Sequence, residues 1–212
     1  MMQEVVLPEI LAGRLKEIYQ GLQDEYDRVA RELHFSCNGC PDNCCDSYFL
    51  HHTYTEWAFL WIGFRRLDAN RQDTLLSRSR TWLEECEKAL AVGGRPQVMC
   101  PLNENGLCGL YEHRLLVCRT HGVPARMKRP DGHELRFPGC FRCQEIVAVD
   151  YLDKQPPHVE RTPLLHSLAA LENQLLGGKR HLLPKVRITI AEMLVKGPPA
   201  LPAGHEGRNT EP

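Results

Sequence analysis

Nine cysteines in short groups constrain this chain more than any other feature of its sequence. The first group, Cys37-Asn-Gly-Cys40-Pro-Asp-Asn-Cys44-Cys45, lies among residues that favour a loop. The remaining thiols follow later in the chain, at Cys100, Cys108, Cys118, Cys140 and Cys143. Thiolates are soft ligands suited to zinc and to iron–sulfur clusters, and a C-x-x-C turn can bring two of them to one metal. We therefore expect a fold in which these groups meet.

The number of metal centres is open at this stage. Nine thiols exceed one four-ligand site, so either there are two centres or some cysteines are spectators. The side chains of Cys44 and Cys45 diverge, and one of them could serve a second metal, act as a redox thiol or pack into the core. The tenth cysteine, Cys86, falls on the apolar face of a predicted helix and is interpreted as a core residue. The metal itself, zinc or iron in a cluster, is equally open.

The charge balance and the N-terminal sequence narrow the class of protein. The 212 residues carry 26 Lys and Arg against 27 Asp and Glu, so no global charge indicates a nucleic-acid or membrane partner. We find no secretory signal and no apolar stretch near the roughly 20 residues that span a bilayer. We expect a cytoplasmic protein, in which cysteines serve as ligands or redox groups rather than as disulfides.

Hydrophobic periodicity predicts a mainly α fold. Apolar residues recur every three or four positions over residues 8–33 and 68–91, which predicts amphipathic helices. The segment Thr53-Tyr-Thr-Glu56 has capping-box spacing and predicts a further helix after it. Two more helices are expected over residues 163–176 and 183–195.

Turn signals complete the predicted organisation. Asn103-Glu-Asn-Gly106 predicts a short hairpin that brings Cys100 near Cys108, and residues 128–132 predict a second turn. We expect one cysteine-cluster metal-binding domain over residues 1–196, with its core motifs in 35–122 and its C-terminal helices in 163–195. Residues 197–212, rich in Pro and Gly, are expected to be disordered.

Several polar residues near the cysteines are further candidates. Histidines could donate to a ligand or act as a base, and of His51, His52, His113 and His121 the last, just after Cys118, is the strongest candidate. Arg114 and Arg119 could balance the negative charge of metal-bound thiolates or hold an anionic substrate. The alternative for each histidine is a surface position or a satisfied position in the core, and the alternative for each arginine is an exposed salt bridge.

The order of motifs over residues 35–122 resembles the bacterial CxxCxxCC cysteine-cluster family, described as a zinc- or iron-chelating domain. The resemblance includes Cys-Pro-Leu, Asn-Gly-Leu-Cys, Leu-Tyr-Glu-x-Arg and Cys-Arg as well as the first cluster. This chain differs by one extra residue between Cys40 and Cys44 and by Leu115, where the family usually has proline. The resemblance implies a metal or iron–sulfur centre, and it adds Tyr111 to the candidate cofactor-binding residues.

Three functions follow as hypotheses. The first is a cytoplasmic protein that holds an iron–sulfur cluster or zinc, with no activity that the sequence reveals. The second is a cluster-dependent enzyme, such as a redox protein or a protein N-methyltransferase, because some relatives of the family look like S-adenosylmethionine-dependent methylases of flagellin lysines. The third is a structural zinc adaptor, so a protein substrate or partner stays open.

Overall fold

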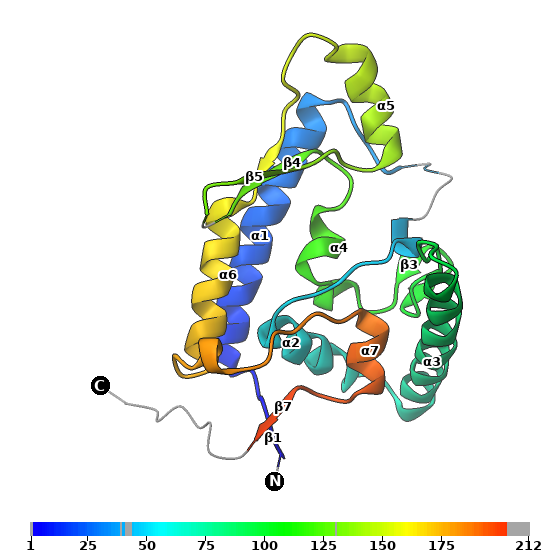
Figure 1. Ribbon diagram of the computed structural model, residues 1–212, viewed down its shortest axis with the longest axis vertical. Coiled ribbons are helices and arrows are strands. Elements are labelled where there is room, and N and C mark those ends of the chain that lie inside the picture. The colour runs from blue at the N-terminus through cyan, green and yellow to red at the C-terminus, as the bar shows by residue number, and fades with distance from the viewer. Residues whose placement is uncertain (1, 39, 41–43, 130, 203–212) are drawn as a thin grey trace. The chain divides into compact units, whose positions relative to one another are not determined.

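The computed structural model describes residues 2–38, 40, 44–129 and 131–202 (Figure 1). About 52% of the chain is helical, which confirms the prediction of a mainly α fold. The chain folds into two compact units. Unit 1 comprises Met1–Ala12, Cys45–Leu115 and Leu171–Pro212, and unit 2 comprises Gly13–Cys44 and Leu116–Ala170. The single domain expected over residues 1–196 stays a prediction, since two compact units can belong to one domain.

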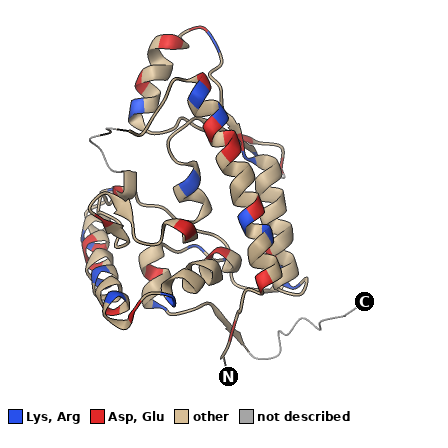
Figure 2. Ribbon diagram, turned by 180° about the vertical axis from the view of Figure 1, so that it is seen from behind, with Lys and Arg blue, Asp and Glu red and all other residues tan. Residues whose placement is uncertain are grey.

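Unit 1 is built from helices and two small strand pairs. Its elements are β1 (Met2–Glu4), α2 (Tyr54–Phe64), α3 (Ala69–Ala91), β2 (Asn103–Glu104), β3 (Leu107–Cys108), the 3₁₀ turns η2 (Tyr111–His113) and η3 (Arg180–Leu182), α7 (Ile190–Val195) and β7 (Ala200–Pro202). β1 pairs antiparallel with β7, and β2 pairs antiparallel with β3. Charges of both signs occur along α3, whose buried residues are Leu75, Ser79, Trp82 and Cys86 (Figure 2).

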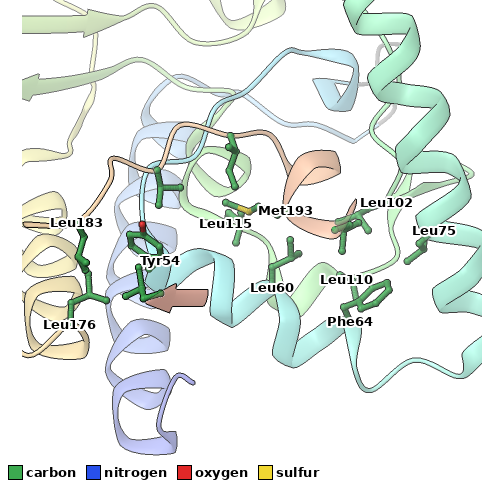
Figure 3. Close-up of a cluster of buried hydrophobic side chains, with 14 residues drawn as sticks. Tyr54, Leu60, Phe64, Leu75, Leu102, Leu110, Leu115, Leu176, Leu183 and Met193 are labelled. Atoms are coloured by element: carbon green, nitrogen blue, oxygen red, sulfur yellow. The ribbon is translucent and has the colours of Figure 1, made fainter. Parts of the chain in front are cut away.

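The core of unit 1 gathers around α2 (Figure 3). Leu60, Phe64 and Met193 are almost fully buried in one apolar cluster. The indole N–H groups of Trp57 and Trp61 both donate to the Met193 carbonyl oxygen, at 3.1 and 2.9 Å. Both bonds go to the Met193 carbonyl oxygen, which lies near the C-terminal end of α7, where the last carbonyl groups of a helix have no partner within the helix.

The N-terminus of α2 is fixed by its cap and by a buried carboxylate. Thr53 is the N-cap and accepts from the Glu56 N–H, as the sequence predicts. Glu172, only 2% exposed, accepts from the backbone N–H groups of Tyr54 at 2.9 Å and Thr55 at 2.8 Å. A carboxylate at this position is stabilised by the helix dipole.

Unit 2 combines helices with a three-stranded sheet. Its elements are most of α1 (Glu9–Glu32), α4 (Leu116–Thr120), β4 (Ala125–Lys128), β5 (Glu134–Phe137), α5 (Phe141–Asp150), β6 (Val159–Glu160) and most of α6 (Thr162–Leu175). The strand order is β5-β4-β6, antiparallel for β4 with β5 and parallel for β4 with β6. Val29, Leu33, Val123 and Val159 form its buried core together with the Cys143 side chain.

The structure confirms most of the predicted elements and corrects others. The helices expected over residues 8–33, after Thr53, over 68–91 and over 163–176 correspond to α1, α2, α3 and α6. The helix expected over residues 183–195 is wrong for its first half, because Ile188 instead forms a β-bridge with His51, and only α7 is helical. Helix α5 was not expected.

The predicted disordered tail contains a strand at its start. Residues Ala200–Pro202 form β7, and Leu201 is buried opposite Gln3. The burial of Leu201 and the pairing with β1 give residues 200–202 a regular structure that the composition of the segment does not predict. The rest of the expected tail, from residue 203 on, lies outside the described residues.

Candidate functional site

One group of cysteines lies in unit 2, and we call Cys37, Cys40, Cys44, Cys140 and Cys143 the Cys37 group. The Tyr26 hydroxyl lies 3.8 Å from the Cys37 sulfur. Tyr26 also interacts electrostatically with Cys140 and Cys44, and Cys143 interacts with Cys140 and Cys37. The C-x-x-C pair at the start of α5 therefore lies near the first cysteine cluster, from which it is separated by about a hundred residues of sequence.

A close approach of two glycines places Cys140 in this group. Gly139 has φ +87°, and a Cβ at this position would lie 2.6 Å from the Gly122 carbonyl oxygen. The same carbonyl oxygen accepts from the Cys140 N–H at 3.0 Å. Only glycine tolerates both this conformation and this contact, so the segment that carries Cys140 is held against the loop after α4.

Two residues that the sequence analysis missed contact the Cys37 group. Arg142, between the two cysteines of α5, donates a hydrogen bond to the Cys40 sulfur, which raises the pKa of the guanidinium. Burial, and then the neighbouring cysteines Cys37, Cys140 and Cys44, raise the pKa of the Tyr26 hydroxyl. Arg142 supplies a positive charge beside sulfur, and Tyr26 supplies a neutral hydroxyl.

Cys143 differs from Cys140 in its surroundings. Its side chain is fully buried in the core of unit 2, and this burial, followed by the charges of Cys140 and Cys37, raises the pKa of Cys143 to about 12. Cys140 is the N-cap residue of α5 and is only partly buried. The pair thus offers one accessible and one enclosed sulfur.

A second group of cysteines lies in unit 1, and we call Cys45, Cys100 and Cys108 the Cys108 group. The Cys100 N–H donates to the Cys45 carbonyl oxygen at 2.9 Å. The hairpin expected around Asn103 is present as β2 and β3, in which Asn103 pairs with Cys108. Burial raises the pKa of Cys108, the backbone N–H of Leu110 opposes this, and the neighbouring Cys45 raises the pKa further.

The other predicted site residues divide between the units. Arg114 belongs to unit 1, where its guanidinium lies 3.7 Å from the centre of the Tyr111 ring and interacts with Cys108. Cys118 and Arg119 lie on α4 in unit 2, and the Arg119 guanidinium lies 4.5 Å from the centre of the Tyr19 ring. His121 follows α4, and its backbone N–H donates to the Val117 carbonyl oxygen at 3.0 Å.

Of the three candidate histidines in unit 1, His51 and His113 are buried and His52 is exposed. His113 is buried against the Phe59 ring, with 4.8 Å between ring centres, and it fills the space left by Gly63. His52 is exposed, with Nδ1 3.3 Å from the Val186 carbonyl oxygen. His51 is 1% exposed, and neither of its ring nitrogens has a hydrogen-bond partner among the described residues.

Thiols are suited to soft metals in general, so the arrangement of the cysteines decides whether they form a metal site. The ten cysteines, all of which the structure describes, form no disulfide. Cys86 is buried beside Trp82 and Ala191, which confirms its interpretation as a core residue. Among the described residues, no three Cys, His, Asp or Glu side chains already lie in a geometry that could hold a metal ion. The described side chains thus form no ready-made metal site, and an ion would require them to move closer together.

Comparisons with known proteins add no relative. No protein-family model, no curated protein and no solved structure matches the chain. The resemblance of residues 35–122 to the cysteine-cluster family therefore stays a prediction from its motifs. Within the described part of the chain, no helix has the length and apolar character needed to cross a membrane.

Proposed function

We propose that this protein binds zinc or iron, the latter in an iron–sulfur cluster, through two separate groups of cysteines. The observation that carries the proposal is the division of the neighbours Cys44 and Cys45. Cys44 interacts with Tyr26 beside Cys37 and Cys140, whereas Cys45 interacts with Cys108 and lies next to Cys100. Two adjacent thiols that cannot comfortably bind one ion are thereby assigned to different ligand sets.

The ligand chemistry supports soft metals. In unit 2 the Cys37 group provides five thiols, more than a tetrahedral zinc or a cubane cluster requires. Arg142 beside Cys40 supplies a positive charge that would offset part of the negative charge of a thiolate-bound metal. In unit 1 the Cys108 group provides three thiols, and Arg114 plays the corresponding electrostatic role for Cys108.

Elemental analysis of anaerobically purified protein, combined with a visible absorption spectrum, tests the proposal. Iron with sulfide and a band that bleaches on reduction would identify a cluster, and colourless stoichiometric metal would identify zinc. We expect Cys37→Ser and Cys108→Ser each to lower the metal content and to destabilise the fold, because metal binding is coupled to folding. Cys86→Ser serves as the matched control and should retain the full content.

The result that contradicts the proposal is a protein without metal after anaerobic purification and reconstitution. Unchanged metal content in both Cys37→Ser and Cys108→Ser would equally exclude the cysteine groups as ligands. Full loss of metal in each single variant would show one shared centre instead of two.

The position of Cys140 and Cys143 favours a second candidate function, thiol–disulfide exchange. Cys140 occupies the N-cap position of α5 and Cys143 lies in the first turn, an arrangement suited to an attacking and a resolving thiol. The Cys140 thiolate would attack a disulfide of a partner protein and release one thiolate. Attack by Cys143 on the mixed disulfide would then release the second thiolate, leaving the partner reduced and the α5 pair oxidised.

Incubation in glutathione redox buffers followed by mass spectrometry tests this second function. A Cys140–Cys143 disulfide that forms and is reduced again within the glutathione range would support it. A pair that stays reduced in oxidising buffer, in protein from which metal has been removed, would exclude it.

A further inference from the structure

The chain between Glu172 and Glu192 carries basic residues and no acidic ones. This segment contains four lysines and arginines and one histidine, at Lys179, Arg180, His181, Lys185 and Arg187. The chain as a whole has a formal net charge of −1, so the segment is a local departure from an even balance. It lies within unit 1 and contains no cysteine.

Part of this segment lines a hollow of about 560 Å³. Four basic side chains face it, namely His52, Arg180, His181 and Lys185, and the buried residues Leu183 and Val186 form its apolar floor. No carboxylate lines the hollow among the described residues. Two of these side chains, Arg180 and Lys185, are cationic at neutral pH, and the two histidines offer ring nitrogens.

Arg180 is held in place by a carboxylate that lies beneath it. Its Nε lies 3.4 Å from Glu172, and its Nη1 donates to the Leu183 carbonyl oxygen at 3.4 Å. Glu172 is shared with the amides of Tyr54 and Thr55 at the start of α2. The Glu172 carboxylate thus orients the Arg180 guanidinium, although most of the hydrogen bonds that Glu172 accepts come from the start of α2.

The other basic side chains have no such counter-charge. His52, His181 and Lys185 form no ion pair in the described part of the chain. The Lys185 ammonium therefore has no ion-pair partner among the described residues, and the histidine rings add nitrogens that can donate to an anion. This arrangement differs from that of helix α3, which carries charges of both signs (Figure 2).

We propose that this hollow binds the phosphate groups of a phosphorylated small molecule. A guanidinium presents paired N–H donors that match phosphate oxygens, and a lysine ammonium adds a mobile point charge. The volume exceeds what a phosphate needs, so Leu183 and Val186 would contact an organic part of the ligand. The site is distinct from both cysteine groups and does not depend on metal binding.

Titration calorimetry of the full chain with sodium pyrophosphate tests this proposal. We expect that Lys185→Gln weakens binding about tenfold, because it replaces an ammonium charge by a neutral amide, and that His181→Leu weakens it about tenfold, because it removes a ring N–H donor. Both residues are exposed, so neither substitution disturbs the core. Lys88→Gln, an exposed lysine of α3 outside the hollow, is the matched control and should leave the affinity unchanged. Metal content is measured before and after titration, because pyrophosphate can chelate metals.

Three results would overturn the proposal. They are the absence of binding at millimolar pyrophosphate, an affinity that both variants leave unchanged, and binding of a single-stranded oligonucleotide without binding of pyrophosphate. The last result would assign the basic segment to nucleic acid instead of a small phosphorylated ligand.

Discussion

Replacement of His51 by leucine should remove an acid sensitivity that is built into unit 1. His51 is almost fully buried, and its ring nitrogens have no hydrogen-bond partner among the described residues. Burial, with a smaller contribution from His52, lowers the pKa of His51 from 6.5 to about 3. The folded protein therefore holds this imidazole neutral under conditions in which the unfolded chain would protonate it.

The sign of the effect follows from proton binding. Between pH 6.5 and pH 3 the unfolded state binds one more proton at this residue than the folded state, so the free energy of unfolding falls as the pH falls. Above pH 6.5 this residue lowers the free energy of unfolding hardly at all. Below pH 6.5 it lowers the free energy of unfolding by about 1.4 kcal/mol for each pH unit. From pH 7 to pH 5 the wild-type protein should lose about 2 kcal/mol through this group alone.

Urea unfolding of the wild type and of His51→Leu at pH 7, 6 and 5 measures this loss. Leucine has a similar volume and no titrating group, so the difference in stability between variant and wild type should move in favour of the variant by about 2 kcal/mol from pH 7 to pH 5. His166→Gln, an exposed histidine of α6, controls for the loss of a histidine in general. A difference between His51→Leu and wild type that stays constant over this pH range would refute the reasoning.

Two further predictions concern the supports of the candidate sites. Gly139→Ala should destabilise the protein by about 3 kcal/mol in urea unfolding, because its Cβ would meet the Gly122 carbonyl oxygen. Gly132→Ala, at a similar positive φ but with open space around it, should lose only about 1 kcal/mol, and equal losses would show that the close approach is unimportant. Glu172→Gln should lower the free energy of unfolding by roughly 2–4 kcal/mol and with it the melting temperature. The substitution weakens the hydrogen bonds from the backbone N–H groups at the start of α2, and it leaves Arg180 without its counter-charge. An unchanged melting temperature, matching that of the exposed control Glu84→Gln, would contradict this role.

The helices that the sequence predicts are those with strong local signals. The apolar repeat of α1 and the caps of α2 and α3, Thr53 and Asp68, specify their elements within a few residues of sequence. The turn at Asn105 and Gly106 is equally local, and both residues have positive φ as a tight hairpin requires.

The elements that the sequence did not predict correctly depend on partners that are distant in sequence. Pro184 suits the first turn of a helix as well as an extended segment, and the β-bridge of Ile188 with His51 decides for the extended form. The order of residues 200–202 likewise depends on pairing with β1. Helix α5 has a weak apolar periodicity, so no pattern in its sequence distinguishes it from a loop.

The same limit applies to the candidate site. Spacing identifies Cys37 with Cys40 and Cys140 with Cys143 as local pairs, but it does not reveal which pairs associate. Tyr26 reaches Cys37 from the preceding helix, and Arg142 reaches Cys40 from α5. An arginine inside a C-x-x-C motif is a signal that could have been used, because its charge complements thiolates.

The antiparallel pairing of β1 with β7 makes the two ends of the described chain neighbours. Met2 lies opposite Pro202, so a short flexible linker could join these ends without disturbing either strand. New termini could then be opened at the exposed turn after α3, where Val92 is 84% exposed and Gly93 follows. A circularly permuted chain of this kind would keep both cysteine groups and the basic hollow intact while changing the order in which they are synthesised.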